Sequence, residues 1–486
     1  MKRKINYNVG TTHSFYEQEI QEALNWLIQV RDQEQHGWAW VQFIRPNEQN
    51  TAEVVHTLLN FIDKLDESTI KLIAESVCEW LINPQNHARI TIDYSWVLIA
   101  LASVLKCKQI MEYINNDSLL SSITTCAVWL LRNQQDNGGW ADNPQEKTST
   151  IRTSLAIFAL NQLVEINESY NCFASIIKET ELSIENGVKW LLDAQNHDGG
   201  WGNIRERDID WIYQKKVELS YADLKFQCET NAASTGYALL ALSVQRITKV
   251  HLVVTKKARE AIFRLQKPNG SWDIFIEVGI RDGERFTFRH FGTTWALTGL
   301  VLSGDSDFSD ESIMEGLNYL IQLQDRNYGG WRCSLDADNY TWATCNALDT
   351  IQLVKDQITE IYSRDFMKII FDWWRLKKKE ASFSIRVHNV IFSFNAPMGF
   401  IFCLSFSIMM LLAVSTIHSV LVSNFQEISE LVNGIIVVVS AFILGIPWIV
   451  WVQNVFHKEM DSWINSIGWV YGIITGFIIV FYQYLV

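Results

Sequence analysis

Two kinds of helical pattern alternate along the chain between about residues 15 and 360. Segments of the first kind, such as Ser183–Gln195, carry apolar residues on one face and charged residues on the other, and this spacing predicts helices at the surface of the fold. Segments of the second kind, such as Thr230–Leu242, are apolar nearly all round with small residues interleaved. Helices of that kind are buried on several sides. The alternation therefore predicts outer helices paired with inner helices.

Each outer segment ends in a similar phrase that runs from an apolar helix end to an Asn-Gly or Asp-Gly step and a tryptophan. Such a step predicts a turn. Six hairpins stacked in a ring can bury inner helices that no hairpin could bury alone, so the repeat predicts an all-α fold, an (α/α)6 toroid of helix hairpins. The six copies lie at Trp26–Trp38, at Trp80 (without a closing tryptophan), at Trp129–Trp140, at Trp190–Trp201, and before Trp272 and Trp331.

The composition changes sharply after Lys377–Lys379, where three long apolar stretches follow at about residues 397–422, 431–455 and 464–486. Each is long enough to cross a bilayer. We therefore predict three domains: the toroid at 1–376, a basic juxtamembrane linker at 377–395, and a transmembrane module of about three helices at 396–486. The lysines favour an integral membrane protein with a cytoplasmic toroid and an external C-terminus. The module is either a plain anchor or an effector, and oligomers could form through it.

Composition and charge narrow the classes of partner. With 48% hydrophobic and 20% charged residues the chain is not expected to be disordered, and its net charge of −13 argues against nucleic-acid binding. The 8 cysteines are scattered without a Cys-x-x-Cys pair, which is typical of reduced cytosolic thiols. The basic start Met1–Lys4 leads into polar residues, so we expect no signal peptide.

The phrase Gln-x-x-x-Gly-Gly-Trp resembles the QW repeat of squalene-hopene cyclases and related prenyltransferase-like toroids. In that family the glutamine caps a helix end and the tryptophan ring stacks on it, so the resemblance implies a structural role for the matching residues. The likeness covers about residues 15–360 and implies the fold more than an activity, because one toroid hosts many functions. The residues that carry it are Gln134, Trp140, Gln195, Trp201, Trp272, Gln324 and Trp331.

Acidic residues follow the last copy in Asp336-Ala-Asp338-Asn339. Class II terpene cyclases, which the chain resembles, carry Asp-x-Asp-Asp with a protonated middle aspartate, whereas the fourth position here is asparagine. The resemblance makes Asp336 and Asp338 candidates for a catalytic acid or for ligands of a metal-bound diphosphate. Helix capping by Asp338 or Asn339 is the alternative. We expect no metal site of the protein's own and no certain cofactor; magnesium is expected only with a bound diphosphate.

A basic insertion precedes the fifth inner helix, with Arg281, Arg285, Arg289 and His290. Cations beside a helix N-terminus suit a phosphate or diphosphate, although Asp282 and Glu284 leave open a self-paired surface loop. Because this insertion and the aspartates precede neighbouring inner helices, we expect them to meet at one end of the ring.

Aromatic residues stand near the starts of four inner helices, where their faces could hold an isoprenoid chain or shield a carbocation. An ordinary core is the alternative. They are Trp96, Tyr237, Trp295 and Trp342.

Two functions follow, and both stay open. The first is a membrane-anchored terpene-cyclase or prenyltransferase-like toroid that binds, and cyclises or transfers, an isoprenoid or isoprenoid diphosphate. The second is a non-catalytic toroid that senses an anionic or lipidic ligand, or a protein, and acts through the transmembrane module, as in signalling or immune membrane proteins. Class II cyclases place their cavity between two helical domains, and this chain has one, which counts against the first.

Overall fold

The computed structural model describes residues 9–41, 44–82, 90–142, 146–210, 220–244, 249–281, 284–303, 311–334, 337–364, 382–387 and 390–395. The chain divides into two compact units, Met1–Glu360 and Ile361–Val486. Apart from residues 361–364, the described part of the second unit is an antiparallel hairpin of β3 (Ser382–Val387) and β4 (Val390–Asn395), which falls in the segment predicted as a linker. The three predicted membrane spans lie outside the described residues. Among the helices that are described, none has the length and apolarity that a membrane crossing needs.

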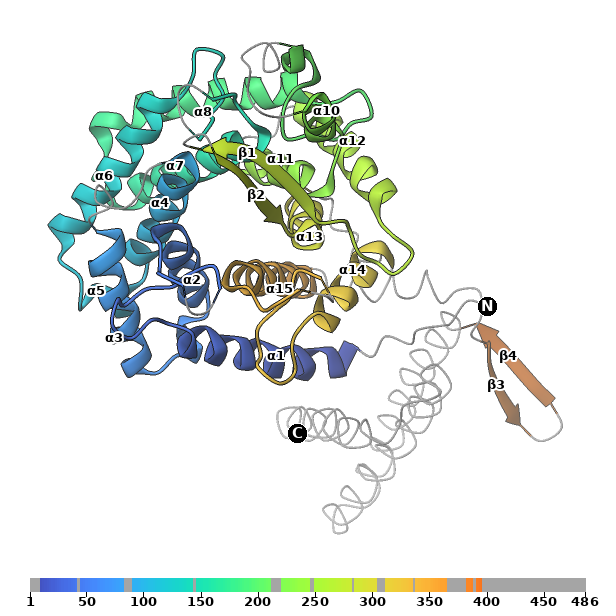
Figure 1. Ribbon diagram of the computed structural model, residues 1–486. Helices are drawn as coiled ribbons and strands as arrows, with labels where there is room; N and C mark the ends of the chain where they lie inside the picture. Colours follow the sequence, from blue (N-terminus) through green and yellow to red (C-terminus); the bar gives the residue numbers. More distant parts are fainter. Residues whose placement is uncertain are drawn as a thin grey trace, which may run out of the picture. The chain divides into compact units, whose positions relative to one another are not determined.

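The described helices of the first unit form two concentric layers of a ring (Figure 1). This arrangement confirms the mostly helical α/α toroid. The inner helices are α2 (Glu48–Asn60), α4 (Thr91–Lys106), α7 (Thr150–Tyr170), α11 (Ala232–Ser243), α13 (Gly292–Leu302) and α15 (Thr341–Arg364). The outer helices are α1 (Val9–Gln29), α3 (Glu67–Ser76), α6 (Asn116–Asn133), α8 (Ala174–Ala194), α12 (Lys249–Leu265) and α14 (Glu311–Gln322). Short helices α5 (Lys108–Met111) and α10 (Tyr221–Cys228) lie in the connections.

The burial of the two layers follows the apolar patterns. Every residue of α11 from Ala232 to Leu242 is buried, as expected for a helix with apolar residues all round. The outer helix α8 instead buries one stripe, which includes Ile184, Val188 and Leu191. The ring is therefore held together mainly by apolar burial around its inner helices.

Each closing tryptophan joins its outer helix to the inner helix that follows. The indole N–H of Trp201 donates to the backbone oxygen of Leu191 at 2.8 Å, and the backbone N–H of Trp201 donates to Thr235 Oγ1 at 3.0 Å. The indole of Trp201 is completely buried. The same two kinds of bond recur at Trp38 with Leu27 and Thr51, Trp140 with Leu130 and Thr153, Trp272 with Ile262 and Thr293, and Trp331 with Leu320 and Thr344.

The glutamines of the same phrase join neighbouring outer helices. Gln195 Nε2 donates to the backbone oxygen of Gly199 in its own turn at 2.7 Å and to that of Val254 in α12 at 3.1 Å. Gln324 makes the equivalent bonds to Gly329 and to Glu19 of α1, and it thereby closes the ring. The remaining bridges are Gln134 with Gly138 and Ser183, and Gln266 with Gly270 and Ser312.

The fold is mostly helical rather than all-α, because the predicted insertion loop is an antiparallel hairpin. Strand β1 (Phe275–Arg281) pairs with β2 (Glu284–His290). In β2, Phe286, Phe288 and His290 alternate with Arg285, Thr287 and Arg289, and this period of two with aromatic residues favours a strand. Contacts from Trp40, before α2, and Arg152, in the first turn of α7, place the hairpin across the end of the ring at which the inner helices begin (Figure 1).

Candidate functional site

A threonine near the start of an inner helix shows which side of that helix faces the outer layer and which faces the centre of the ring. Each threonine that binds a tryptophan backbone N–H faces the outer layer. Residues two apart on a helix lie about 200° apart, so the residue two positions later faces the centre of the ring. For α4 the same position is found from Thr91, whose hydroxyl donates to the backbone oxygen of Ala141 as that of Thr150 donates to Gly202. These six residues, the interior layer, are Glu53, Trp96, Leu155, Tyr237, Trp295 and Asn346.

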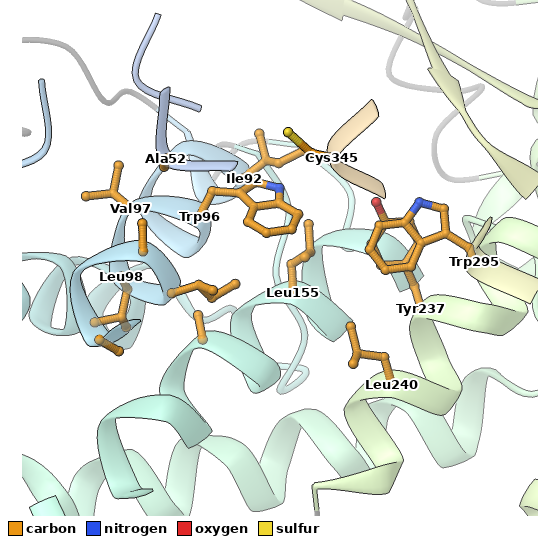
Figure 2. Close-up of a cluster of buried hydrophobic side chains, with 14 of the residues drawn as sticks. Ala52, Ile92, Trp96, Val97, Leu98, Leu155, Tyr237, Leu240, Trp295 and Cys345 are labelled. Carbon is orange, nitrogen blue, oxygen red and sulfur yellow. The ribbon is translucent and has the colours of Figure 1, made fainter. Parts of the chain in front are cut away.

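Three of the four predicted aromatics belong to this interior layer. Tyr237 stacks on Trp295 with ring centroids 3.6 Å apart, and Trp96 lies across the interior with Leu155 nearby (Figure 2). All three aromatic side chains are buried. The fourth, Trp342, precedes Asn346 by one turn of α15 and stacks on Tyr340, with centroids 5.6 Å apart. The ring therefore presents aromatic faces to its interior from three inner helices.

The interior layer also contains a carboxylic acid that the sequence analysis did not single out. Glu53 is 4% exposed, and burial, with a further contribution from Asp349, raises its pKa to about 8. The signal was present in the sequence, because Thr51-x-Glu53 repeats the spacing of Thr235-x-Tyr237 and Thr293-x-Trp295.

About one turn after Glu53 and Asn346 along their helices, α2 and α15 are joined by hydrogen bonds between polar side chains, the polar strip. Thr57 Oγ1 donates to Asp349 Oδ2 at 2.8 Å, and Asn60 Nδ2 donates to Asp349 Oδ1 at 3.1 Å. Burial raises the pKa of Asp349, against the opposing effect of His56. Burial has the opposite effect on His56, because it disfavours the charged imidazolium and lowers the pKa. His56 Nδ1 lies 2.8 Å from Ser103 Oγ. This strip joins the last inner helix to the first.

The hairpin is held over the ring by a buried ionic cluster, the Arg152 cluster. Arg152 makes two 2.8 Å bonds to the carboxylate of Asp142, and its Nη1 donates to Glu277 Oε2 of β1 at 2.7 Å. Glu277 Oε2 also lies 3.0 Å from His290 Nε2, and Glu277 Oε1 accepts from Asn203 Nδ2 at 3.0 Å. His290, a predicted anion ligand, is thus buried against a carboxylate of its own hairpin.

The charges of the Arg152 cluster stabilise one another. Burial alone would raise the pKa of Glu277, but the charge of Arg152 and the hydrogen bond from His290 lower it to about 2. Burial also disfavours the charge of Arg152, yet Asp142 and Glu277 raise its pKa well above the ordinary value. Since each ionic group is compensated, the cluster is suited to fixing the hairpin.

The predicted arginines take different places in the hairpin. Arg281 pairs with Glu284 and Arg285 with Ile280 in the strand register. Arg289 is exposed and lies beside the thiol of Cys333, where it opposes the rise in the pKa of that thiol that burial causes. The arginine segment thus approaches the last turn of the ring at Cys333.

The predicted acidic motif is described in part. Asp338 is exposed, and Asp336 lies outside the described residues, so a magnesium-bound diphosphate at this pair stays a prediction. Asn339 Nδ2 donates to Asp325 Oδ2 at 3.4 Å, and Arg332 pairs with the same oxygen. Burial would raise the pKa of Asp325, but bonds from the backbone of Asn327 and from Arg332 hold it below its usual value. The buried acid of this turn is therefore Asp325.

We expect Asp338→Asn to change the free energy of unfolding by less than about 0.5 kcal/mol, because the side chain is exposed. Asp325→Asn should cost about 1 to 3 kcal/mol, because it weakens the buried acceptor of Arg332 and Asn339. Urea unfolding of both variants checks this. Equal losses would show that Asp338 has a buried partner.

Comparison with known proteins identifies the family to which the chain belongs. A family model, the prenyltransferase alpha-alpha toroid domain, matches residues 92–171, 203–289 and 284–435, which together exceed half of the chain. The squalene–hopene cyclase of Zymomonas mobilis is 25% identical over 226 residues, 44% of this chain and 30% of that protein. Lanosterol synthase erg7A of Aspergillus fumigatus is 24% identical over 240 residues, 49% of this chain and 28% of that protein.

These two cyclases are distant homologues, and the chain spans less than a third of their length. Among solved structures, the unsaturated glucuronyl hydrolase of Bacillus sp. GL1 is similar with a TM-score of 0.50 at 11% identity, over 70% of this chain and 97% of that one. A likeness at that identity shows the shared ring fold alone.

Proposed function

Since the chain belongs to the prenyltransferase alpha-alpha toroid domain family, we propose that its terpene-cyclase-like ring binds an isoprenoid chain among the side chains of the interior layer. The observation that carries the proposal is the convergence of Trp96, Tyr237 and Trp295 from three inner helices (Figure 2). Isoprenoid chains are apolar and unsaturated, and both properties suit a site with aromatic faces.

The positions of the charged side chains support an apolar ligand in the interior, with the hairpin β1–β2 fixed over one end of the ring. The interior layer contains no Lys, Arg or His, so it offers no cation to a diphosphate. Arg152, which is near, is already paired with Asp142 and Glu277. A diphosphate, if the ligand carries one, would therefore lie outside the interior layer, where the exposed Arg289 beside Cys333 is a candidate partner.

The proposal is tested by photo-crosslinking the full-length protein with a diazirine-bearing farnesol. Labelled peptides should come from α4, α11 and α13, and excess unlabelled farnesol should suppress the labelling. Trp295→Ala should weaken binding about 3- to 30-fold, because it removes one aromatic face. Trp129→Ala is the control, because Trp129 stacks on Tyr94 from the outer helix α6 and lies outside the interior layer. Labelling confined to outer helices, or unaffected by farnesol, would overturn the proposal.

A further inference from the structure

Glu53 differs in chemistry from the other members of the interior layer. It stands on α2 at the position that Trp96, Tyr237 and Trp295 occupy on their own helices. Its orientation follows from Thr51, whose Oγ1 accepts from the backbone N–H of Trp38 at 3.0 Å and so faces the outer layer. A carboxyl group therefore faces the same interior as the aromatic rings.

The carboxyl group of Glu53 is only partly satisfied. Oε1 accepts a hydrogen bond from Gln49 Nε2 at 2.9 Å, one turn earlier on α2. Oε2 is buried and has no hydrogen-bond partner among the described residues. Buried polar atoms in folded proteins nearly always have a partner, so an unpaired one facing the interior points to a ligand atom.

The surroundings of Glu53 determine its protonation state. Burial and the nearby Asp349 raise its pKa to about 8, against the bond from Gln49, so the carboxyl group is mostly protonated at neutral pH. Tyr237 and Cys345 lie close enough to interact electrostatically with Glu53. Burial raises the pKa of each well above its ordinary value, so both stay neutral. Asp349 accepts hydrogen bonds from Thr57 and Asn60. Burial lowers the pKa of His56, so His56 does not supply a cation to Glu53.

We propose that Oε2 of Glu53 binds the ligand directly by donating a hydrogen bond to an uncharged oxygen atom of an isoprenoid alcohol or ketone. This inference rests on the proposed function and adds the polar end of the ligand. A protonated carboxyl group is a donor, whereas its ionised form is an acceptor only. A site that hydrogen-bonds a ligand oxygen rejects the analogue that lacks it, because its own buried polar group is then left unpaired.

The test compares farnesylacetone, an isoprenoid ketone whose oxygen accepts hydrogen bonds but cannot donate them, with farnesene, an isoprenoid hydrocarbon that lacks the oxygen, on the full chain between pH 6.5 and 9.5. Farnesylacetone affinity should fall about tenfold or more as pH rises through about 8, because the donor is lost when Glu53 ionises. Farnesene affinity should change much less with pH. Glu53→Gln keeps a donor that does not titrate, so its farnesylacetone affinity should be independent of pH, and Glu53→Leu should remove the preference for the ketone.

Glu19→Gln is the matched control, because Glu19 lies on the outer helix α1, has a buried unpaired Oε2, and burial raises its pKa. It should keep the pH profile of the wild type. If farnesylacetone and farnesene bind equally well and without pH dependence, the assignment of Glu53 fails while the proposed function stands. If neither binds, the proposed function fails with it.

Discussion

Replacing Arg152 with methionine is expected to destabilise the ring by about 3 to 5 kcal/mol, because the buried carboxylate of Asp142 then loses its counter-charge and that of Glu277 keeps only His290. Asp142 and Glu277 are both at least nine-tenths buried, and each accepts from the guanidinium at 2.7 to 2.8 Å. The loss should appear in the urea midpoint of unfolding and as faster proteolysis in the hairpin β1–β2, which Arg152 holds to α7.

The control removes the orphaned charges as well. Arg152→Met combined with Asp142→Asn and Glu277→Gln should recover a large part of the lost stability, because an uncharged cluster leaves no unpaired ion in the interior. A single variant that unfolds within about 1 kcal/mol of the wild type would mean that water reaches the cluster and screens it.

The same cluster predicts how stability depends on acid. The pKa of Glu277 is about 2 in the fold and takes the ordinary value of 4.5 once the chain unfolds. Its stabilising effect is therefore fully present above about pH 4.5 and is lost as the pH falls toward 2. In Arg152→Met the main cause of the lowered pKa is absent, so this acid-dependent loss of stability between pH 4.5 and 2 should shrink.

The ring could be predicted from the sequence because its information is local and repeated. The apolar pattern of segments such as 230–242 and the glutamine and tryptophan of each phrase recur at fixed spacing, and each copy makes the same bonds in the structure. Gln195 and Trp201 thus have neighbours that follow from the period alone. A repeat specifies a fold in this way because each hairpin needs its neighbours to bury the inner helix.

The features outside the period were harder to predict. Arg152 and Glu277 are separated by 125 residues, and charge pairing over that distance has no local signal. The segment 281–290 was predicted as a loop, although its alternation of aromatic and polar residues forms β2, and anion binding by its arginines stays a prediction. Glu53 was not predicted as a site residue, because the side of α2 on which it lies follows only from the hydrogen bond of Thr51, two residues earlier, to Trp38.

Trp201→Ala is expected to lower the free energy of unfolding by about 3 kcal/mol, because it removes a completely buried indole. The side chain fills the junction between α8 and α11, where its N–H donates to Leu191 at 2.8 Å. Thermal and urea unfolding of the full chain measure the effect.

Two further variants separate the contributions of the indole. Trp201→Phe keeps an aromatic ring but leaves the oxygen of Leu191 without its donor, so it should recover most of the packing and still cost about 1 kcal/mol for the hydrogen bond. Trp40→Ala is the exposed control: Trp40 is 37% exposed and forms a T-shaped pair with Phe288, so its loss should cost about 1 kcal/mol. If Trp201→Ala unfolds no more easily than Trp40→Ala, the junction is not the tightly packed joint described above, and the stability of the ring must come from the inner helices alone.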